Sequence, residues 1–212
     1  MKYSAVIVAA GKGSRMQLGY NKVYAPLADG RAILAHTMDV FAKDEDCTQI
    51  VVVTEPEAFL HMRQGQWPSK TVVAAGGRTR QESVNNGLMA VKEEIVMIHD
   101  GARPYLDRDS LAALKRVMET EQAACLAVPC KDTIAVVKDG YIAEALDRNV
   151  LRAAQTPQVF RTELIRKCMF RSLQENYTGT DDCSLVMKWS DVRIAVVEGS
   201  YTNKKITTPE DL

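Results

Sequence analysis

A glycine-rich turn that carries basic residues follows the first apolar run of the chain. Residues 5–8 lead directly into Ala9-Ala10-Gly11-Lys12-Gly13-Ser14-Arg15-Met16, and Lys22 stands shortly after this turn. Backbone N–H groups in such a turn can converge on phosphate oxygens. The two cations Arg15 and Lys22 could neutralise the charge of a triphosphate while its α-phosphorus is attacked. Taken alone, the turn is explained equally well as a solvated loop with incidental basic residues.

Two common nucleotide-binding motifs do not fit this turn. A dinucleotide-binding fold would have GxGxxG, but Met16 stands where the third glycine belongs. A P-loop would have GxxxxGK followed by Ser or Thr, which the turn also lacks. After the second apolar run, Glu55 is the only acidic residue placed to contact a ribose. The pattern therefore disfavours an NAD-dependent oxidoreductase.

The elements that would position this turn alternate between strand-like and helix-like patterns. Apolar β-branched runs that are typical of strands covered on both faces occur at 5–8, 50–53, 72–74, 95–98, 126–128 and 194–197. Helical spacing lies between them at 33–41, 84–91 and 111–118. This alternation predicts an α/β fold with a doubly wound, mostly parallel sheet. Ligands bind such sheets beyond the carboxyl ends of the strands, where the glycine turn and Asp100 would both lie.

Residues 132–155 interrupt the alternation of strands and helices. Residues 133–137 and 141–146 are strand-like and are joined by Asp139-Gly140, a dipeptide typical of tight hairpin turns. A hairpin that projects from a doubly wound sheet cannot bury both of its faces on its own core. We therefore expect this arm to pack on a second copy of the chain in a homodimer. The alternative is a hairpin that folds back over its own domain.

The composition limits the possible partners. The 212 residues include 46% hydrophobic and 25% charged residues, as in an ordinary globular domain. With 27 Lys and Arg against 27 Asp and Glu, the net charge is zero, which gives no support for nucleic acid or an acidic membrane as a partner. No apolar run approaches the roughly 20 residues that span a bilayer. The five cysteines show no metal-binding spacing and predict reduced thiols in the cytoplasm.

Motifs along the whole chain resemble those of nucleotidyltransferases. Residues 9–24 resemble the AAGxGxRM signature, with its following lysine, of sugar-nucleotide and polyol-phosphate nucleotidyltransferases. Residues 76–84 resemble the GG…R…SV element, and residues 99–104 resemble the HDAARP element. Further matches follow in order at 132–133, 147–149, 154–158, 180–182 and 205–212. Together they make the chain similar to the 2-C-methyl-D-erythritol 4-phosphate cytidylyltransferase family.

This resemblance implies a fold and a reaction. It implies one Rossmann-like nucleotidyltransferase domain over residues 1–212, with the β-arm inserted at about 132–155. It further implies transfer of CMP from CTP to 2-C-methyl-D-erythritol 4-phosphate with release of pyrophosphate, a step in isoprenoid precursor synthesis by the non-mevalonate pathway. A phosphomonoester has a second pKa of about 6 and is largely dianionic at neutral pH. We therefore expect no general base, and His36, His61 and His99 are not assigned such a role.

The resemblance also assigns roles by position. Arg15 and Lys22 would be catalytic, and Lys205 and Arg148 would position substrate and stabilise the transition state. CTP would be bound by Ala9, Ala10, Gly11, Gly13, Gly77, Arg80 and Ser83. The acceptor would be bound by Asp100, Arg103, Thr133, Arg148, Thr156 and Thr180. Asp100 would also lie beside Mg²⁺, which prefers carboxylate and phosphate oxygens. From the arm, Thr133 and Arg148 would reach the active site of the partner copy.

Two departures from the family pattern leave alternatives open. The chain has Asn21-Lys22-Val23 where relatives commonly have Pro-Lys-Gln. Gly101 replaces the usual alanine of HDAARP and resembles ribitol-5-phosphate cytidylyltransferases, which make a teichoic-acid precursor. Residues 154–158 and 180–186 favour the methylerythritol phosphate acceptor over ribitol phosphate. A third alternative, from a different class, is a non-catalytic nucleotide-binding module, against which the five charges of Arg15, Lys22, Asp100, Arg148 and Lys205 argue.

Overall fold

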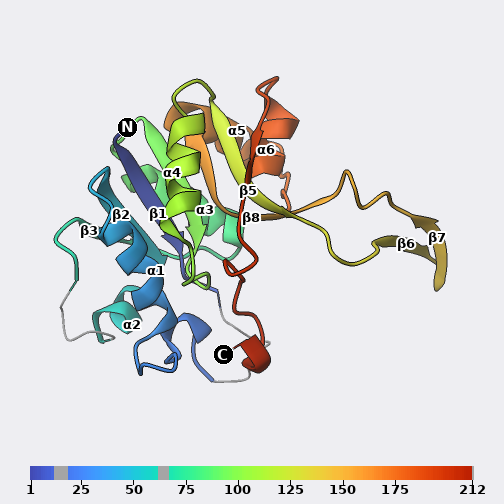
Figure 1. Cartoon of the computed structure of the whole chain (residues 1–212). Helices are drawn as coiled ribbons and strands as arrows, with labels where there is room; N and C mark the ends of the chain where they lie inside the picture. Colours follow the sequence, from blue (N-terminus) through green and yellow to red (C-terminus); the bar gives the residue numbers. More distant parts are fainter. Residues whose placement is uncertain (12–18, 62–66, 212) are drawn as a thin grey trace.

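A seven-stranded sheet runs through the main body of the chain in the order β3-β2-β1-β4-β8-β5-β9 (Figure 1). The structure is a computed structural model that describes residues 1–11, 19–61 and 67–211. The strands of this sheet are β1 (Tyr3–Val8), β2 (Cys47–Thr54), β3 (Thr71–Ala75), β4 (Ile95–Asp100), β5 (Ala123–Pro129), β8 (Arg152–Arg161) and β9 (Ala195–Glu198). All neighbouring strands are parallel except β8, which is antiparallel to β4 and β5.

Helices cover both faces of the sheet and give a three-layer α/β fold (Figure 1). On one face, α1 (Ile33–Ala42) and α4 (Arg108–Val117) bury residues such as Phe41 and Leu114 against the strands. On the other face, α3 (Arg80–Ala90), α5 (Thr162–Gln174) and α6 (Asp182–Trp189) bury residues such as Val84 and Met169. The short elements are η2 (Lys22–Tyr24), α2 (Pro56–His61) and η3 (Pro209–Asp211). The predicted doubly wound, mostly parallel sheet is confirmed.

One strand of the main sheet was not among the predicted elements. The sequence of β8, Arg152-Ala-Ala-Gln-Thr-Pro-Gln-Val-Phe-Arg, is too polar to give a strand signal. Its polar side chains Gln155, Thr156 and Gln158 are nevertheless buried. Each of them is hydrogen-bonded to another part of the chain, which makes their burial tolerable. The helices α2, α5 and α6 were also not predicted.

The predicted hairpin is present as a sheet of its own that projects from the main body (Figure 1). Strands β6 (Ala135–Lys138) and β7 (Tyr141–Ala145) are antiparallel and joined by Asp139 and Gly140. Both turn residues have positive φ, 51° and 83°, as a two-residue hairpin turn of this kind requires. Strand β8 begins at Arg152 and pairs with Pro129 of β5, so the last residues of the predicted range 132–155 belong to the main sheet.

Within the described ranges, no helix is long and apolar enough to cross a bilayer.

Candidate active site

A cavity of about 680 Å³ opens at the carboxyl ends of β1, β3 and β4. Strand order reverses between β1 and β4, because β2 and β3 lie on one side of β1 and β4 lies on the other. Such a switch point is where doubly wound sheets bind their ligands. The cavity wall includes Ala9 after β1, Gly76 and Gly77 after β3, and Asp100 at the end of β4. The predicted location of the site at this edge therefore coincides with the cavity.

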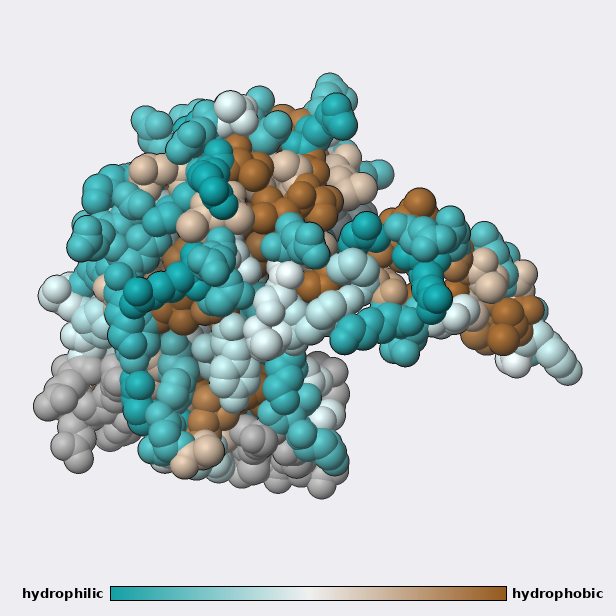
Figure 2. All heavy atoms as spheres, viewed as in Figure 1, coloured by the Kyte–Doolittle hydropathy of each residue, from teal (hydrophilic) through white to brown (hydrophobic). Residues whose placement is uncertain are grey.

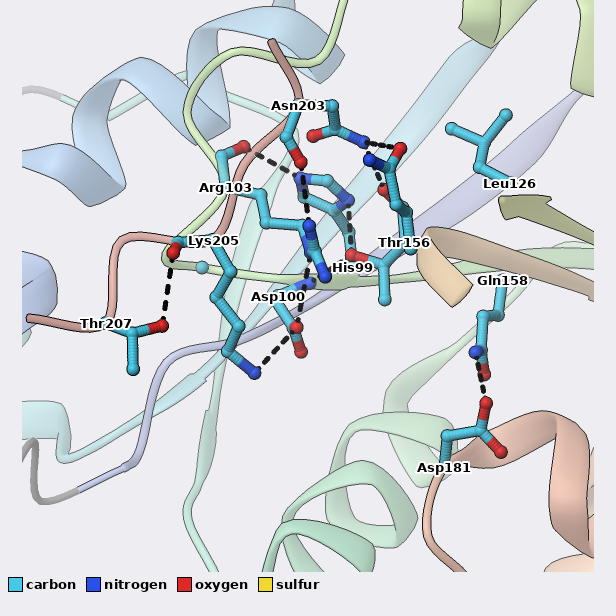
Figure 3. Close-up of polar contacts among 12 residues, drawn as sticks. His99, Asp100, Arg103, Leu126, Thr156, Gln158, Asp181, Asn203, Lys205 and Thr207 are labelled. Carbon is cyan, nitrogen blue, oxygen red and sulfur yellow. Dashed lines mark hydrogen bonds and ion pairs between the residues drawn. The ribbon is translucent and has the colours of Figure 1, made fainter. Parts of the chain in front are cut away.

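Asp100 is the centre of a charged cluster in the cavity (Figure 3). Its carboxylate lies 2.9 Å from Nζ of Lys205, 3.5 Å from Nε of Arg80 and 3.6 Å from Nε of Arg103. Burial alone would raise the pKa of this carboxyl, but the charges of Arg80, Lys205 and Arg103 outweigh burial and hold the pKa well below its usual value. Asp100 is therefore an ionised carboxylate that orients three cations.

Arg80 is held between two carboxylates. Its Nη2 donates a hydrogen bond of 2.8 Å to Asp182, which is 1% exposed. Burial would lower the pKa of Arg80, but Asp182 and Asp100 outweigh it and raise that pKa. The backbone of Asp182 is itself fixed, since its N–H and that of Cys183 donate to the side-chain oxygen of Gln158 on β8. Arg80 thus presents a fixed positive charge to the cavity.

Asn21, which stands where relatives commonly have proline, fixes the loop that brings Lys22 to the cavity. The side chain of Asn21 donates to the carbonyl of Ala9 and accepts from the N–H of Val23, so it ties η2 to the end of β1. The Nζ of Lys22 donates to the carbonyl of Ile206 at 2.6 Å. Asn21 thereby supplies the stiffness that the Pro-Lys-Gln pattern would otherwise give to this loop.

His99 lies behind Asp100 and does not face the cavity. Its Nε2 is 3.0 Å from the carbonyl oxygen of Arg103, which can only accept, so Nε2 carries the proton. Its Nδ1 then accepts from the hydroxyl of Thr156 at 3.0 Å, and that hydroxyl accepts from the backbone N–H of Asp100. Burial lowers the pKa of His99 to about 4. The imidazole is therefore neutral and serves to hold the turn that carries Asp100.

The neutral state of His99 makes folding stability depend on pH. In the unfolded chain the imidazole takes up a proton near its ordinary pKa of 6.5, whereas in the folded chain it does so only near 4. The unfolded state therefore binds more protons between these values, and stability falls as the pH drops through this window. From pH 7.5 to pH 5 we expect the free energy of unfolding to fall by about 2 kcal/mol, measured by urea denaturation. His99→Asn should flatten this dependence, and an unchanged slope in the variant would contradict the assignment.

The opposite wall of the cavity requires glycine. A Cβ at Gly76 would lie 2.3 Å from the Cβ of Ala10, and a Cβ at Gly77 would lie 2.4 Å from the Cβ of Glu82. The hydroxyl of Ser83 accepts from the N–H of Gly77 at 3.0 Å and donates to the carbonyl of Thr79 at 2.9 Å. The close packing of Gly76 on Ala10 and of Gly77 on Glu82 therefore leaves no room for a side chain at either glycine.

If this wall binds the nucleotide that the motifs imply, Gly77→Ala should raise the nucleotide KM about tenfold, because an added methyl group in a packed loop forces the backbone to shift. The nearest clash involves the backbone of Glu82 and Ser83 as well as a side chain, so the shift cannot be absorbed by a rotamer change. Initial-rate kinetics with each substrate varied in turn would measure this effect. A variant with an unchanged nucleotide KM would show that this wall does not contact the nucleotide.

Most of the residues assigned to the site from the sequence lie at this one cavity. Those that line it are Ala9, Ala10, Gly11, Lys22, Gly77, Arg80, Ser83, Asp100 and Lys205. Arg103 and Thr156 contact Asp100 from behind. Gly13 and Arg15 lie outside the residues that the structure describes.

Three of the assigned residues are not at the cavity in a single chain. Thr133 and Arg148 are exposed on the arm, where Arg148 donates to the carbonyl of Lys131. Thr180 is exposed beside a smaller hollow of about 70 Å³ that is also lined by Arg80 and Asp182. Thr133 and Arg148 therefore do not line the cavity of their own chain.

Two residues that support the site were not predicted from the sequence. Asp182 pairs with Arg80, and Asn203 contacts both Arg103 and β8. Asp182 stands within the matching segment 180–182, but a carboxylate next to a helix start is ordinarily explained as a cap. Asn203 gives no signal at all, because a short amide between a threonine and two lysines is typical of an exposed turn.

Comparison with known proteins identifies the family. A family model described as 2-C-methyl-D-erythritol 4-phosphate cytidylyltransferase matches residues 3–212. A protein of that name from Halalkalibacterium halodurans is 44% identical over 217 residues, which cover 100% of this chain and 94% of the relative. The chain belongs to this family. It is therefore a nucleotidyltransferase, as the motifs predicted, and the non-catalytic alternative is not supported.

Solved structures of cytidylyltransferases share this fold. The enzyme from Francisella tularensis has a TM-score of 0.85 and 31% identity, with 98% of this chain and 95% of that chain covered. The structure titled 4-diphosphocytidyl-2C-methyl-D-erythritol synthase from Anaerococcus prevotii has a TM-score of 0.86 and 30% identity, with 99% and 92% covered.

Gly101, which resembled ribitol-phosphate cytidylyltransferases, has a local explanation in this member of the methylerythritol phosphate family. A Cβ there would lie 3.0 Å from the carbonyl oxygen of Val8 and 3.1 Å from the Cβ of Ala9. The N–H of Gly101 donates to the same carbonyl at 2.9 Å. Glycine thus permits a close approach of β1 to the turn after β4, and the residue does not line the cavity.

Proposed function

We propose that this cavity transfers the cytidylyl group of CTP to 2-C-methyl-D-erythritol 4-phosphate and releases pyrophosphate. The observation that carries the proposal is the cluster of Arg80 and Lys205 around Asp100, facing the backbone wall at Gly76 and Gly77, in a chain of this family. The cations suit phosphate groups, and the backbone wall suits a planar base with amide-like donors and acceptors.

The proposed reaction is a displacement at phosphorus. An oxygen of the acceptor phosphate forms a bond to the α-phosphorus of CTP, and the bond from that phosphorus to the bridging oxygen of the β-phosphate breaks. Pyrophosphate leaves with the electron pair of the broken bond. The acceptor phosphate is largely dianionic at neutral pH, so no side chain has to remove a proton. The burial of His99, with both ring nitrogens hydrogen-bonded, agrees with this requirement.

The side chains would accelerate this reaction through alignment and charge stabilisation. Lys22 and Lys205 line the cavity from η2 and from the C-terminal segment, and Nζ of Lys22 donates to the carbonyl of Ile206 in that segment. In this proposal they hold the α-phosphate and the charge that builds up on its oxygens. Arg15 would add a guanidinium group from the glycine turn. Asp100 would keep the neighbouring cations in place before substrate binds.

Mg²⁺ is proposed as the cofactor, held by Asp100 together with phosphate oxygens and water. Asp100 fits this role because it is ionised and lines the cavity. No group of three carboxylate, histidine or cysteine side chains among the described residues could hold an ion unaided. This donor set suits a cation that takes most of its ligands from a nucleotide, as Mg²⁺ commonly does. When bound, Mg²⁺ would reduce the negative charge on the triphosphate.

The arm is proposed to complete the active site of a second chain in a homodimer. Figure 2 shows apolar side chains on the surface of the arm, and Val137, Tyr141, Ile142 and Val150 are each more than 60% exposed. An isolated two-stranded hairpin with such a surface is marginally stable in water and is stabilised by packing on another chain. A two-fold partner would place Thr133 and Arg148 of each chain at the acceptor phosphate of the other. The oligomeric state is measurable by analytical ultracentrifugation.

Pyrophosphate release tests the proposed function. The protein would be assayed with Mg²⁺, CTP and either methylerythritol phosphate or ribitol 5-phosphate, with ATP, GTP and UTP as matched controls for the base. We expect release with CTP and methylerythritol phosphate only. Pyrophosphate release with ribitol 5-phosphate but not with methylerythritol phosphate would contradict the proposed acceptor. No release from the folded protein with either acceptor would contradict the proposed reaction.

A further inference from the structure

We propose that Asn203 is a positioning residue that fixes Lys205 against Asp100. This inference rests on the proposed function, because it acts through the role proposed for Lys205. Lys205 stands in a segment between β9 and η3 that has no regular secondary structure. Such a segment has no ladder of backbone hydrogen bonds to hold it, so individual contacts must fix the position of its side chains.

Asn203 is the most deeply buried polar residue of this segment, with no exposed surface. Its Nδ2 donates to the carbonyl of Thr156 at 2.9 Å and to Oε1 of Gln155 at 3.3 Å (Figure 3). The backbone carbonyl of Asn203 accepts from Nη1 of Arg103 at 2.7 Å. One residue therefore links the C-terminal segment to β8 and to the turn that follows Asp100.

The chemistry of these partners fixes the orientation of the amide. The carbonyl of Thr156 can only accept, so the atom of Asn203 that faces it must be nitrogen. The side-chain oxygen Oδ1 then lies buried without a hydrogen-bond partner in the described part of the chain. A buried acceptor left in this way is costly. The donor bonds to β8 are therefore the reason for an amide at this position.

Gln155 and Gly199 complete the contact on the side of β8. Gln155 accepts from Asn203 and donates from its Nε2 to the carbonyl of Ser200 at 2.9 Å, so its amide is held at both ends. A Cβ at Gly199 would lie 2.5 Å from Oε1 of Gln155. Glycine at this position therefore leaves the space that the Gln155 amide occupies. The Gln155 amide and the backbone at Gly199 are therefore closely packed.

Lys205, which lines the cavity, follows Asn203 by two residues. After Asn203, the N–H of Ile206 donates to the carbonyl of Ala102 at 2.9 Å, and Ile206 is fully buried. Lys205 lies between these two fixed points, and the hydroxyl of Thr207 donates to its carbonyl at 3.1 Å. With its backbone held on both sides, the Nζ of Lys205 is placed 2.9 Å from Asp100. Loss of the Asn203 amide should release one of the two fixed points.

A double-mutant cycle between Asn203 and Lys205 tests this inference. The variants Asn203→Ala, Lys205→Ala and the double variant would be compared in pyrophosphate release from CTP and methylerythritol phosphate. We expect kcat/KM to fall about 100-fold in Lys205→Ala and about tenfold in Asn203→Ala. If Asn203 acts through Lys205, the double variant should be within about twofold of Lys205→Ala. Lys204→Ala is the matched control, since Lys204 is exposed and does not line the cavity, and it should keep full activity.

Thermal unfolding separates positioning from a general loss of structure. A destabilisation caused by Asn203→Ala should be the same whether residue 205 is lysine or alanine, whereas its effect on activity should be present only with lysine. Gln155→Leu leaves the bond from Asn203 to the carbonyl of Thr156 but removes the bonds from Gln155 to Asn203 and Ser200. It weakens the attachment of the same segment to β8 and provides a second cycle if Asn203→Ala yields little folded protein. The inference would be overturned if, in both cycles, the fall in kcat/KM of the double variant equalled the product of the falls in the two single variants. Full activity of Asn203→Ala would also overturn it. Absence of activity in the unsubstituted protein would instead contradict the proposed function and remove the basis for this role.

Discussion

Asp100→Asn is expected to lower kcat/KM by about 100- to 1,000-fold, the range seen when one preorganised charged or polar group is removed from an active site. The substitution keeps the shape of the side chain but removes its charge. Arg103 and Lys205 would then lose their carboxylate partner, and Arg80 would keep only Asp182. In the proposed mechanism it also removes the protein ligand of Mg²⁺. Steady-state pyrophosphate release measures the effect.

The same substitution should lower the stability of the fold. Removing one partner of a buried ion pair typically costs about 3–5 kcal/mol, because the remaining charge stays buried. The expected cost here is smaller, because the side chains of Lys205 and Arg80 are 38% and 33% exposed and can be hydrated. Asp46→Asn is the matched control: Asp46 also pairs with a lysine, Lys115 at 2.8 Å, but lies at the opposite edge of the sheet, next to the start of β2. That variant should retain activity. If Asp100→Asn kept normal kcat/KM, the central role of this carboxylate would be wrong.

Arg148→Ala is expected to raise the KM of the acceptor about 100-fold, while the KM of CTP stays within about twofold. A guanidinium group binds a phosphate through two parallel hydrogen bonds, and alanine offers none. In the single chain Arg148 is exposed and donates to a backbone carbonyl at 3.3 Å. Arg171→Ala is a matched control, because Arg171 is an exposed arginine on α5 that stacks over Trp189. If the Arg148 and Arg171 variants had the same acceptor KM, Arg148 would not bind the acceptor.

Mixing two defective variants tests whether Arg148 acts on the partner chain, at an acceptor concentration far below the raised KM of Arg148→Ala. In a hybrid dimer of Arg148→Ala with Lys22→Ala, one site combines an intact cavity with an intact arm, and the other site carries both defects. Random assortment makes half of the dimers hybrids, so activity should recover to about one quarter of the unsubstituted level. If each arm served its own chain, the mixture would show no recovery.

The sheet and the location of the site were predictable because their signals are local. Buried parallel strands such as β1 and β4 are nearly continuous apolar runs, and the Asp139-Gly140 turn has a composition that few other structures use. The carboxyl edge of the sheet then follows from topology alone. This is why the cavity lies where the glycine turn and Asp100 were expected to meet.

The unpredicted parts depend on partners that are distant in sequence. Strand β8 has a largely polar sequence, and its position between β4 and β5 depends on long-range contacts such as those of Thr156 with His99 and of Gln158 with Asp181. Likewise Asn203 becomes a buried residue only when β8 supplies a carbonyl for its amide. No local pattern in the chain encodes such pairs. Residues that support a site through long-range hydrogen bonds are therefore the ones that sequence analysis misses.

A crystal structure with CTP and Mg²⁺ tests most directly whether this cavity is where the reaction occurs. We predict that the triphosphate enters the cavity, with oxygens of the α-phosphate within about 3.5 Å of Nζ of Lys22 or Lys205, and that the cytosine lies against Gly76 and Gly77. A nucleotide bound elsewhere on the chain, with both lysines remote from its phosphates, would contradict the account.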